Sequence, residues 1–395
     1  MEKFILANYI DPQLIKLKGS ACNSSYFYHN GEKLLLARKT NYSFLENGFT
    51  VTGWPFWYNY ITSEVIYKKD GEHWNPYKIL SEPSSEEKLK YKCCGDEDVR
   101  VAKWGNEVYL SYSYIRCQLD DINAKRNVIP IAVAKLNTDF ELSDIKFVKS
   151  QNRIEKNWQP IISDEYKLKY VYTYKPFTII DTNTSEIIEL PYKFEEDFRG
   201  SSQLIEYENG FLALVHRRLD PQTSYIHYLI QFDRKLKPIK ISDPFKFIGT
   251  NVEYSTFIEL VDGKLIILAS INDQILYEFE INSLLIKDIL NHKLSDATLD
   301  RKSIHIKLFH DALENQNYLS ALCESTFIRN RDYYVEAMKY SRAIGDLSNG
   351  DRLYILNRII RDLCANMINN QKNYFRSNYQ EALQTVSVKS YNERL

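Results

Sequence analysis

Three acids and an arginine stand together in one short stretch of the chain, Gly95-Asp96-Glu97-Asp98-Val99-Arg100. Carboxyl groups this close repel one another when ionised, which favours a carboxylic acid that can donate its proton. The residues from Glu107 to Tyr114 then read as a strand, because β-branched and aromatic side chains dominate them. Acids at the start of a strand are also common as solvated loop residues, with Arg100 paired to Asp98 as scaffold, and that alternative stays open.

Similar polar clusters precede strands at four other places: Cys22-Asn23-Ser24-Ser25, Glu155-Lys156-Asn157-Trp158, Arg199-Gly200-Ser201-Ser202 and Asn251-Val252-Glu253-Tyr254. Each leads into a strand, a turn, a second strand and one or two weaker strands. The clusters start at intervals of roughly 45 to 75 residues, which is broad for a propeller repeat. Five such units predict an all-β, five-bladed β-propeller whose inner strands bring all the clusters to one central funnel.

The elements that must position these clusters change type along the chain. Up to about residue 281, short runs of Val, Ile, Tyr and Phe alternate with polar residues, and turn pairs such as Asn30-Gly31 and Asp262-Gly263 separate them. After Leu284 apolar residues recur at helical spacing, as from Leu353 to Met367. We therefore predict two domains, a catalytic propeller over 1–284 and an α-helical C-terminal region over 285–395. Those helices are expected to pack on the propeller, on a second copy of the chain or on a partner protein.

The composition excludes several classes of function. With 51 Lys and Arg against 52 Asp and Glu, no charge excess indicates nucleic acid or an anionic membrane as partner. No apolar run reaches the length of a membrane span or forms a secretory signal. The six cysteines lack metal or redox spacing, so reduced thiols and a cytoplasmic location are expected. Scattered histidines and the lack of a glycine-rich phosphate loop predict neither a metal nor a cofactor.

The run Glu97-Asp98-Val99-Arg100 and the strand after it resemble the Glu-Asp-Pro-Arg signature of the β-mannoside phosphorylases and mannosidases of glycoside hydrolase family 130. They also resemble the related mannosyltransferases and phosphorylases of glycosyltransferase family 108; both families are five-bladed propellers. Further motifs match in the same order along the chain: Asn23 with Arg38, Lys156-Asn157, His216 and Asp273.

The sequence also departs from that family. Val99 stands where the signature usually has proline, and Tyr174-Lys175-Pro176 replaces a His-Arg-Pro motif, which removes an arginine expected to hold phosphate. The run Arg199-Gly200-Ser201-Ser202 is also unlike the phosphorylase pattern. These differences leave the fold expectation intact and open the choice of acceptor.

The resemblance implies that Asp98 is the catalytic acid, which protonates the leaving oxygen as an oxocarbenium-like transition state forms. We expect the substrate to be bound by Asn23, Arg38, Glu97, Arg100, Glu155, Lys156, Asn157, Trp158, Arg199, Glu253 and Asp273. Phosphate is expected at Lys175, His216 and Arg217, because a phosphorylase needs cations to orient it. The same cations would suit the diphosphate of a sugar nucleotide.

The function expected is glycosyl transfer, of mannosyl type and with inversion, between a glycan acceptor and a sugar 1-phosphate or sugar nucleotide. A β-mannoside hydrolase is one alternative, and it would need a carboxylate base such as Glu155 or Glu253 to activate water. A propeller that binds carbohydrate or serves as a scaffold without catalysis is the other. Trp158, Tyr172, Tyr174 and Tyr254 are candidates for stacking on a sugar ring, although blade packing is the commoner role of such residues.

Overall fold

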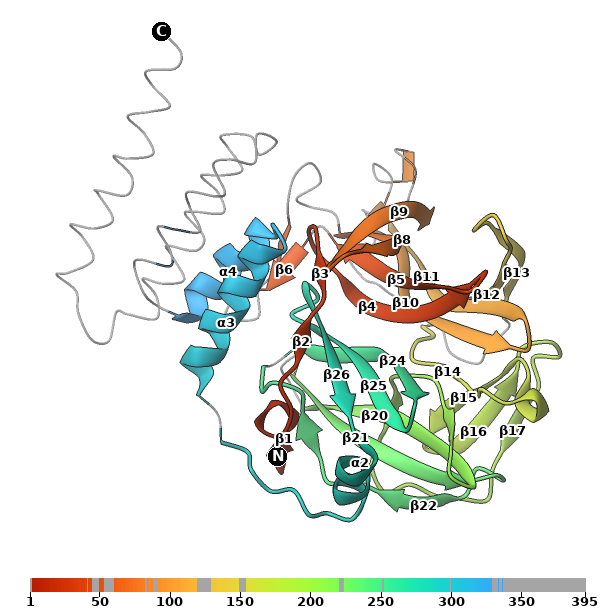
Figure 1. Ribbon diagram of the computed structural model, residues 1–395. Coiled ribbons are helices and arrows are strands. Elements are labelled where there is room, and N and C mark those ends of the chain that lie inside the picture. The colour runs from red at the N-terminus through yellow and green to blue at the C-terminus, as the bar shows by residue number, and fades with distance from the viewer. Residues whose placement is uncertain are drawn as a thin grey trace, which may run out of the picture.

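The computed structural model describes residues 2–40, 42–44, 50–52, 60–81, 84, 86–87, 91–118, 129–148, 154–219, 224–250, 252–298, 300–328, 333 and 336. These residues form a mostly β molecule whose sheets surround a common centre, as in a propeller (Figure 1). The described strands belong to sheets of nine, seven, four and four strands and to one two-stranded pair. The propeller-like β architecture predicted from the sequence is thus confirmed.

The nine-stranded sheet consists of two antiparallel groups, β4-β5-β8-β9 and β10-β11-β12-β13, with β3 added beside β9. Its strands are β3 (Lys16–Leu17), β4 (Cys22–His29), β5 (Glu32–Thr40), β8 (Tyr60–Asp70), β9 (His73–Ser81), β10 (Tyr91–Trp104), β11 (Glu107–Gln118), β12 (Ile131–Leu136) and β13 (Leu142–Phe147). A short parallel pairing of β8 with β10 joins the groups. Close to it, a Cβ on Gly95 would lie 2.4 Å from the carbonyl oxygen of Thr62, so only glycine permits this approach.

Three further large sheets are formed by two short N-terminal strands and by the strands of the later part of the chain. The seven-stranded sheet contains β1 (Phe4–Ile5), β18 (Arg199–Gly200), β19 (Ile205–Tyr207), β20 (Gly210–Leu219), β21 (Ser224–Asp233), β22 (Pro238–Ile241) and β23 (Phe245–Lys246). One four-stranded sheet contains β14 (Gln159–Pro160), β15 (Lys169–Tyr174), β16 (Phe177–Asp181) and β17 (Ile187–Glu189). The other contains β2 (Gln13–Leu14), β24 (Glu253–Val261), β25 (Lys264–Ile271) and β26 (Ile275–Ile281).

Short elements connect these sheets. The two-stranded pair is formed by β6 (Tyr42–Phe44) and β7 (Thr50–Thr52), and the 3-10 helices are η1 (Leu6–Asn8) and η2 (Asp164–Tyr166). The Asn-Gly and Asp-Gly pairs form the predicted turns: φ is +50° and +79° at Asn30 and Gly31, and +49° and +75° at Asp262 and Gly263. Two positive φ angles in succession are typical of the two-residue turns that match the twist of antiparallel strands.

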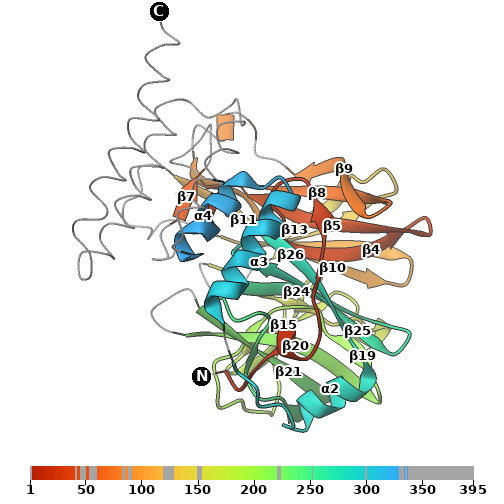
Figure 2. The same cartoon turned by 60° about the vertical axis from the view of Figure 1, so that its left-hand side comes forward.

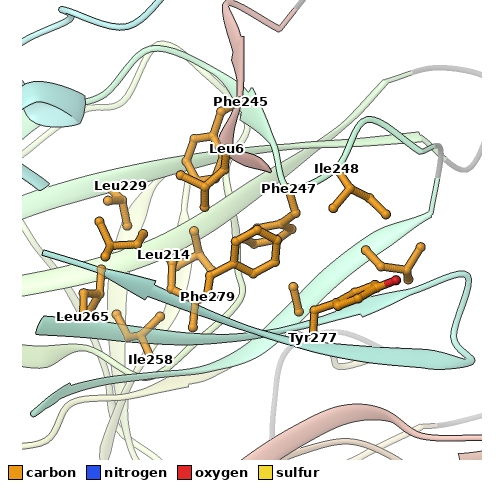
Figure 3. Close-up of a cluster of buried hydrophobic side chains, with 14 of the residues drawn as sticks. Leu6, Leu214, Leu229, Phe245, Phe247, Ile248, Ile258, Leu265, Tyr277 and Phe279 are labelled. Carbon is orange, nitrogen blue, oxygen red and sulfur yellow. The ribbon is translucent and has the colours of Figure 1, made fainter. Parts of the chain in front are cut away.

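A large apolar cluster lies between the sheet of β20 and β21 and the sheet of β24 to β26 (Figure 3). The first sheet contributes Leu214 and Leu229, and the second contributes Ile258, Leu265 and Phe279, all fully buried. Burial of one such side chain stabilises a protein by about 1.5–3 kcal/mol. Packing of this kind fixes the sheets relative to each other and, with them, the inner strand ends that carry the polar clusters.

Three helices follow the last strand in the described part of the chain, α2 (Ser283–Leu290), α3 (Arg301–Glu314) and α4 (Tyr318–Ile328). The side chains of Asn282 and Asp300 cap α2 and α3 by accepting hydrogen bonds from backbone N–H groups. α3 and α4 lie together beside the propeller, close to β26 and β6 (Figures 1 and 2). Residues 337–395 of the predicted helical region lie outside the described residues, and the domain boundary stays a prediction. None of the described helices is long and apolar enough to span a lipid bilayer.

Candidate active site

Asp98 lies at an irregularity of β10, where the pairing with β11 shifts between Glu97 and Arg100. Its backbone has a φ of +56°, in the left-handed region that aspartate adopts more readily than most residues. Its carboxylate accepts a hydrogen bond of 2.5 Å from Nδ2 of Asn23, which lies on β4. The irregularity therefore brings the Asp98 carboxylate to a strand other than its own pairing partner.

Arg100 is buried and holds this irregularity in place. Its guanidinium donates hydrogen bonds to the carbonyl oxygens of Asp98 (2.8 Å), Ser201 (2.8 Å) and Gly200 (3.3 Å) and to the hydroxyl of Tyr254 (2.8 Å). These groups belong to three different sheets, so one side chain links the inner ends of all three. Arg100 thus has the scaffold role left open by the sequence, through the backbone carbonyl of Asp98 rather than through its carboxylate.

Arg38 on β5 is a second buried cation, and it faces three carboxylates. Its guanidinium lies 3.2 Å from Oδ2 of Asp273, 3.7 Å from Oε1 of Glu97 and 3.8 Å from Oδ1 of Asp98. The hydroxyl of Tyr42 lies 3.2 Å from the same guanidinium and donates to Asp273 at 3.2 Å. Asp273, in the turn after β25, is thereby fixed between Arg38 and Tyr42.

The carboxylates around Arg38 differ in their readiness to hold a proton. Burial raises the pKa of Glu97, but the charges of Lys156 and Arg38 outweigh this effect and leave the pKa below its usual range. Lys156 Nζ donates to Glu97 Oε2 at 2.7 Å. For Asp273, burial raises the pKa, with Asp98 and Glu97 adding to the shift while Arg38 opposes it. The site therefore combines an ionised Glu97 with an Asp273 that protonates more readily.

His216, on β20, is a buried neutral imidazole. Its Nδ1 lies 2.9 Å from Oγ of Ser201, and its ring meets those of Tyr225 and Tyr254 edge-on at centroid distances of 5.3 and 5.0 Å. Burial, reinforced by nearby positive groups that include Arg199, lowers its pKa well below the usual value. At neutral pH His216 therefore offers a hydrogen bond to an anion rather than a charge.

Two further predicted residues lie beside His216 and Tyr254. Asn157, with a φ of +67°, accepts a hydrogen bond of 2.8 Å from the Tyr254 hydroxyl. Arg199 is exposed and pairs with His216 in the ladder of β18 and β20. Among the described residues no carboxylate lies within ion-pair distance of Arg199.

The structure thus brings together side chains from the nine-stranded sheet, the seven-stranded sheet, the sheet of β24 to β26 and the loop before β14. The group around the carboxylate of Asp98 comprises Asn23, Arg38, Glu97, Lys156 and Asp273. The group around the Tyr254 hydroxyl comprises Arg100, Asn157 and His216. This is the convergence of polar clusters that the sequence predicted.

Other predicted residues have their side chains occupied by the protein itself. The Glu155 carboxylate accepts hydrogen bonds from Nε1 of Trp158 (3.1 Å) and the hydroxyl of Tyr172 (2.9 Å), and Trp158 is buried in an apolar cluster. Glu253 is fully buried, and its carboxylate accepts backbone N–H groups, including that of Thr250 at 2.5 Å. Both carboxylates brace the loops that lead into the inner strands.

Two of the cations predicted to bind phosphate are also engaged elsewhere. Lys175 is exposed and donates to the backbone carbonyl of Glu195 at 2.7 Å. Arg217 forms an ion pair with Glu196, and it follows His216 on β20, so its side chain points to the opposite face of the sheet. Neither contacts the residues around Asp98 in the described part of the chain.

Glu64 and Tyr42 were not predicted from the sequence. Glu64 lies on β8 directly opposite Arg38 and is 1% exposed, and neither of its carboxyl oxygens has a hydrogen-bond partner among the described residues. Burial raises its pKa well above the usual value, although Arg38 opposes the shift. An acid next to the apolar run Val65-Ile66-Tyr67 is the sequence feature that could have identified Glu64 as a buried group.

The arrangement supports proton transfer at a carboxylate, hydrogen bonding to hydroxyl groups and electrostatic stabilisation of an anion. In the described residues no group of three or more His, Cys, Asp or Glu side chains is placed to hold a metal ion.

No family model matches the chain, and no curated protein matches it in sequence. Its fold is similar to that of a β-1,2-mannobiose phosphorylase from Listeria innocua (14% identity, 71% of this chain and 93% of that chain, TM-score 0.48). It is also similar to a mannose phosphorylase from Leishmania mexicana solved with a phosphate ion (12%, 68% and 88%, TM-score 0.47). A third similar structure is described among the mannoside phosphorylases and hydrolases of glycoside hydrolase family 130 (12%, 68% and 85%, TM-score 0.47). Structures of glycoside hydrolase family 130, which the sequence motifs resemble, are thus among those with a fold similar to that of this chain.

Proposed function

We propose that this protein is a carbohydrate-active enzyme that transfers a glycosyl group of mannosyl type, with inversion, to or from a phosphate-containing partner. The observation that carries the proposal is the setting of Asp98, a carboxylate bonded to Asn23 and flanked by Arg38 at the centre of the propeller. The resemblance of these motif residues to glycoside hydrolase family 130 supports the choice of mannosides as substrate class.

In this proposal Asp98 is the proton donor. Its proton passes to the glycosidic oxygen as the bond from that oxygen to the anomeric carbon breaks, and an oxygen of phosphate forms the new bond from the opposite face. In the synthetic direction Asp98 takes the proton of the acceptor hydroxyl. Asn23 orients the carboxylate through its hydrogen bond of 2.5 Å, and Arg38 stabilises the negative charge that Asp98 gains when its proton leaves.

Arg199 is the cation we propose for phosphate. It is exposed, it has no carboxylate partner among the described residues, and it lies across the β18–β20 ladder from His216. A guanidinium can bind two phosphate oxygens at once, and the neutral His216 or Ser201 can add a hydrogen bond. The diphosphate of a sugar nucleotide would be held by the same groups, so both donors remain within the proposal.

Hydrolysis of β-mannosides is the second candidate. An inverting hydrolase needs a carboxylate base that is free to activate water. The two bases expected from the sequence, Glu155 and Glu253, instead accept hydrogen bonds from Trp158, Tyr172 and backbone amides. This favours a partner that is already a nucleophile, such as phosphate. A carbohydrate-binding or scaffold propeller without catalysis is the third candidate.

Several finer features belong to the proposal. The two antiparallel groups of the nine-stranded sheet would count as separate blades, which gives five with the other large sheets. Residues 1–284 would then form the catalytic propeller, and residues 285–395 a helical region that contacts a second copy or a partner protein. The cytoplasmic location expected from the thiols stays a prediction; Cys22 and Cys323 are buried.

Product analysis tests the function directly. The protein is incubated with mannose-containing acceptors and either mannose 1-phosphate or GDP-mannose, and separately with β-mannosides in the absence of phosphate. Longer glycans with release of inorganic phosphate are expected, and elongation from GDP-mannose alone would identify a transferase within the same proposal. Free mannose released without phosphate would establish the hydrolase instead. No product under any condition would overturn catalysis and favour the binding propeller.

A further inference from the structure

We propose that helices α3 and α4 are part of the active-site scaffold and that Glu324 on α4 is a positioning residue for Asp273. Asp273 contacts Arg38 and Tyr42 inside the propeller, whereas Glu324 comes from the helical region about 50 residues later in the chain. The inference rests on the proposed function for its kinetic readout, and a second readout is independent of activity.

The turn that carries Asp273 is held by a chain of hydrogen bonds to the helices. Asn272 and Asp273 have φ angles of +54° and +55°, a backbone conformation that needs support from its surroundings. Nδ2 of Asn272 donates to Oε1 of Glu324 at 2.7 Å, and Oε2 of Glu324 lies 2.8 Å from Nδ1 of His305 on α3. Glu324 is 1% exposed, and each of its two carboxylate oxygens contacts one of these residues.

A second contact from the helices reaches the same turn. Nδ2 of Asn317, just before α4, donates to Oε1 of Gln274 at 2.9 Å. Nε2 of Gln274 in turn donates to the carbonyl of Asp273 (2.9 Å) and to Oγ1 of Thr40 (2.8 Å). The residues on both sides of Asp273 are therefore tied to the helical region.

These ties matter because Asp273 fixes Arg38, which faces both Glu97 and Asp98. A buried carboxylate such as Glu324 is stable only while donors face it, so the turn and the helices keep one relative position. A displacement of about 1 Å in groups that orient a reaction can lower its rate by about 100-fold. The helical region is thus expected to set turnover rather than to cover the propeller passively.

The test is a double-mutant cycle on Asn272 and Glu324. Asn272→Asp keeps a residue that tolerates the positive φ but places a carboxylate against Glu324 in place of a donor. We expect kcat to fall at least 10-fold with a smaller change in KM. Adding Glu324→Gln should restore kcat to within about 3-fold, because the new amide donates to the new carboxylate and still accepts from His305.

The rescue excludes a direct effect of the introduced charge on Asp273, because the double variant keeps that charge and has the same net charge at the pair as the wild type. The matched control is Glu314→Gln, which removes an ion pair of 2.9 Å between α3 and Lys16 without touching the turn, and its kcat should equal that of the wild type. An undiminished kcat in Asn272→Asp, or no recovery in the double variant, would overturn the inference.

Hydrogen exchange of the amides of residues 271–275 provides the readout without activity. Exchange should accelerate in Asn272→Asp and slow again in the double variant, whatever the protein catalyses. Unchanged exchange would overturn the link between helices and turn. A wild-type protein with no glycosyl transfer, but with this exchange pattern, would overturn the proposed function and leave the link intact.

Discussion

At the scale of single residues, the site contains groups that hold the backbone and groups that remain partly exposed. Arg100 donates hydrogen bonds to three carbonyl groups and a tyrosine hydroxyl, and Glu155 and Glu253 accept hydrogen bonds from protein groups. Asp98, Lys156 and Arg199 keep part of their surface exposed. The sequence predicted both sets as one, because all of them belong to polar clusters that precede inner strands.

Replacement of Arg100 by lysine tests its role in holding the Asp98 irregularity. Lysine cannot reach all four acceptors, and each buried carbonyl left without a donor costs about 1–3 kcal/mol. We expect Arg100→Lys to lower the free energy of unfolding by about 2–4 kcal/mol, measured by urea denaturation. Arg234→Lys, in an exposed ion pair with Glu206, is the control and should change stability by less than about 0.5 kcal/mol. Equal stability of Arg100→Lys and the wild type would contradict the assigned role.

Arg199 and Arg217 form a matched pair for the phosphate proposal. Both are arginines of the same sheet, but Arg217 pairs with Glu196 while Arg199 lies beside His216. Arg199→Gln should raise KM for phosphate by about 10-fold or more, since a charge-assisted hydrogen bond contributes about 1.5–3 kcal/mol. Arg217→Gln should leave KM unchanged in the same steady-state assay. The reverse ranking of the two variants would place the phosphate on the other face of the sheet.

At the scale of elements, the site depends on strands whose inner ends depart from regular geometry. β10 bulges at Asp98, and the turn after β25 carries positive φ at Asp273. A residue in regular β geometry would point its side chain along the sheet normal, so these departures are what aim the carboxylates at Arg38. β21 has another unusual feature, a buried histidine on the strand that pairs with β20.

His227 on β21 predicts a specific pH dependence of stability. It is fully buried beside Phe245 and Phe247, and burial, together with the charge of Lys246, lowers its pKa to about 3. Between its unfolded pKa of about 6.5 and this value the unfolded state binds the extra proton, so stability is lost as the pH falls, by about 1.4 kcal/mol per pH unit.

Replacement of His227 by phenylalanine should remove this pH dependence. Between pH 6.5 and pH 5, the free energy of unfolding of His227→Phe should fall by about 2 kcal/mol less than that of the wild type. Urea denaturation at the two pH values measures the difference. A variant with the same acid sensitivity as the wild type would show that His227 is not buried in its neutral form.

At the scale of the whole molecule, local patterns predicted the strands and long-range contacts decided the site. Alternation and Asn-Gly or Asp-Gly pairs sufficed for hairpins such as β4–β5 and β24–β25, because each is formed by residues close in the sequence. Motif order predicted Asn23, Arg38, Asp98 and Asp273, which the structure brings together.

Other parts of the site depend on neighbours that are distant in the sequence. Glu64 lies opposite Arg38 on another strand, and Glu324 accepts a hydrogen bond from Asn272 in a turn of the propeller. Neither contact has a periodicity or a spacing that a single sequence displays. Glu253 was expected to face the funnel, but its side chain satisfies backbone amides, because the orientation of a residue at a strand entry depends on the loop before it.

Measurement of phosphate release from mannose 1-phosphate by the wild type and Asp98→Asn, with the preferred acceptor, tests the account most directly. Asparagine keeps the shape of the side chain but does not take up the acceptor's proton, and such proton transfer contributes about 10²- to 10⁴-fold to rates. Turnover of Asp98→Asn should therefore fall at least 100-fold while its unfolding transition stays close to that of the wild type. Near-normal turnover in this variant would contradict the assignment of Asp98 and with it the proposed mechanism.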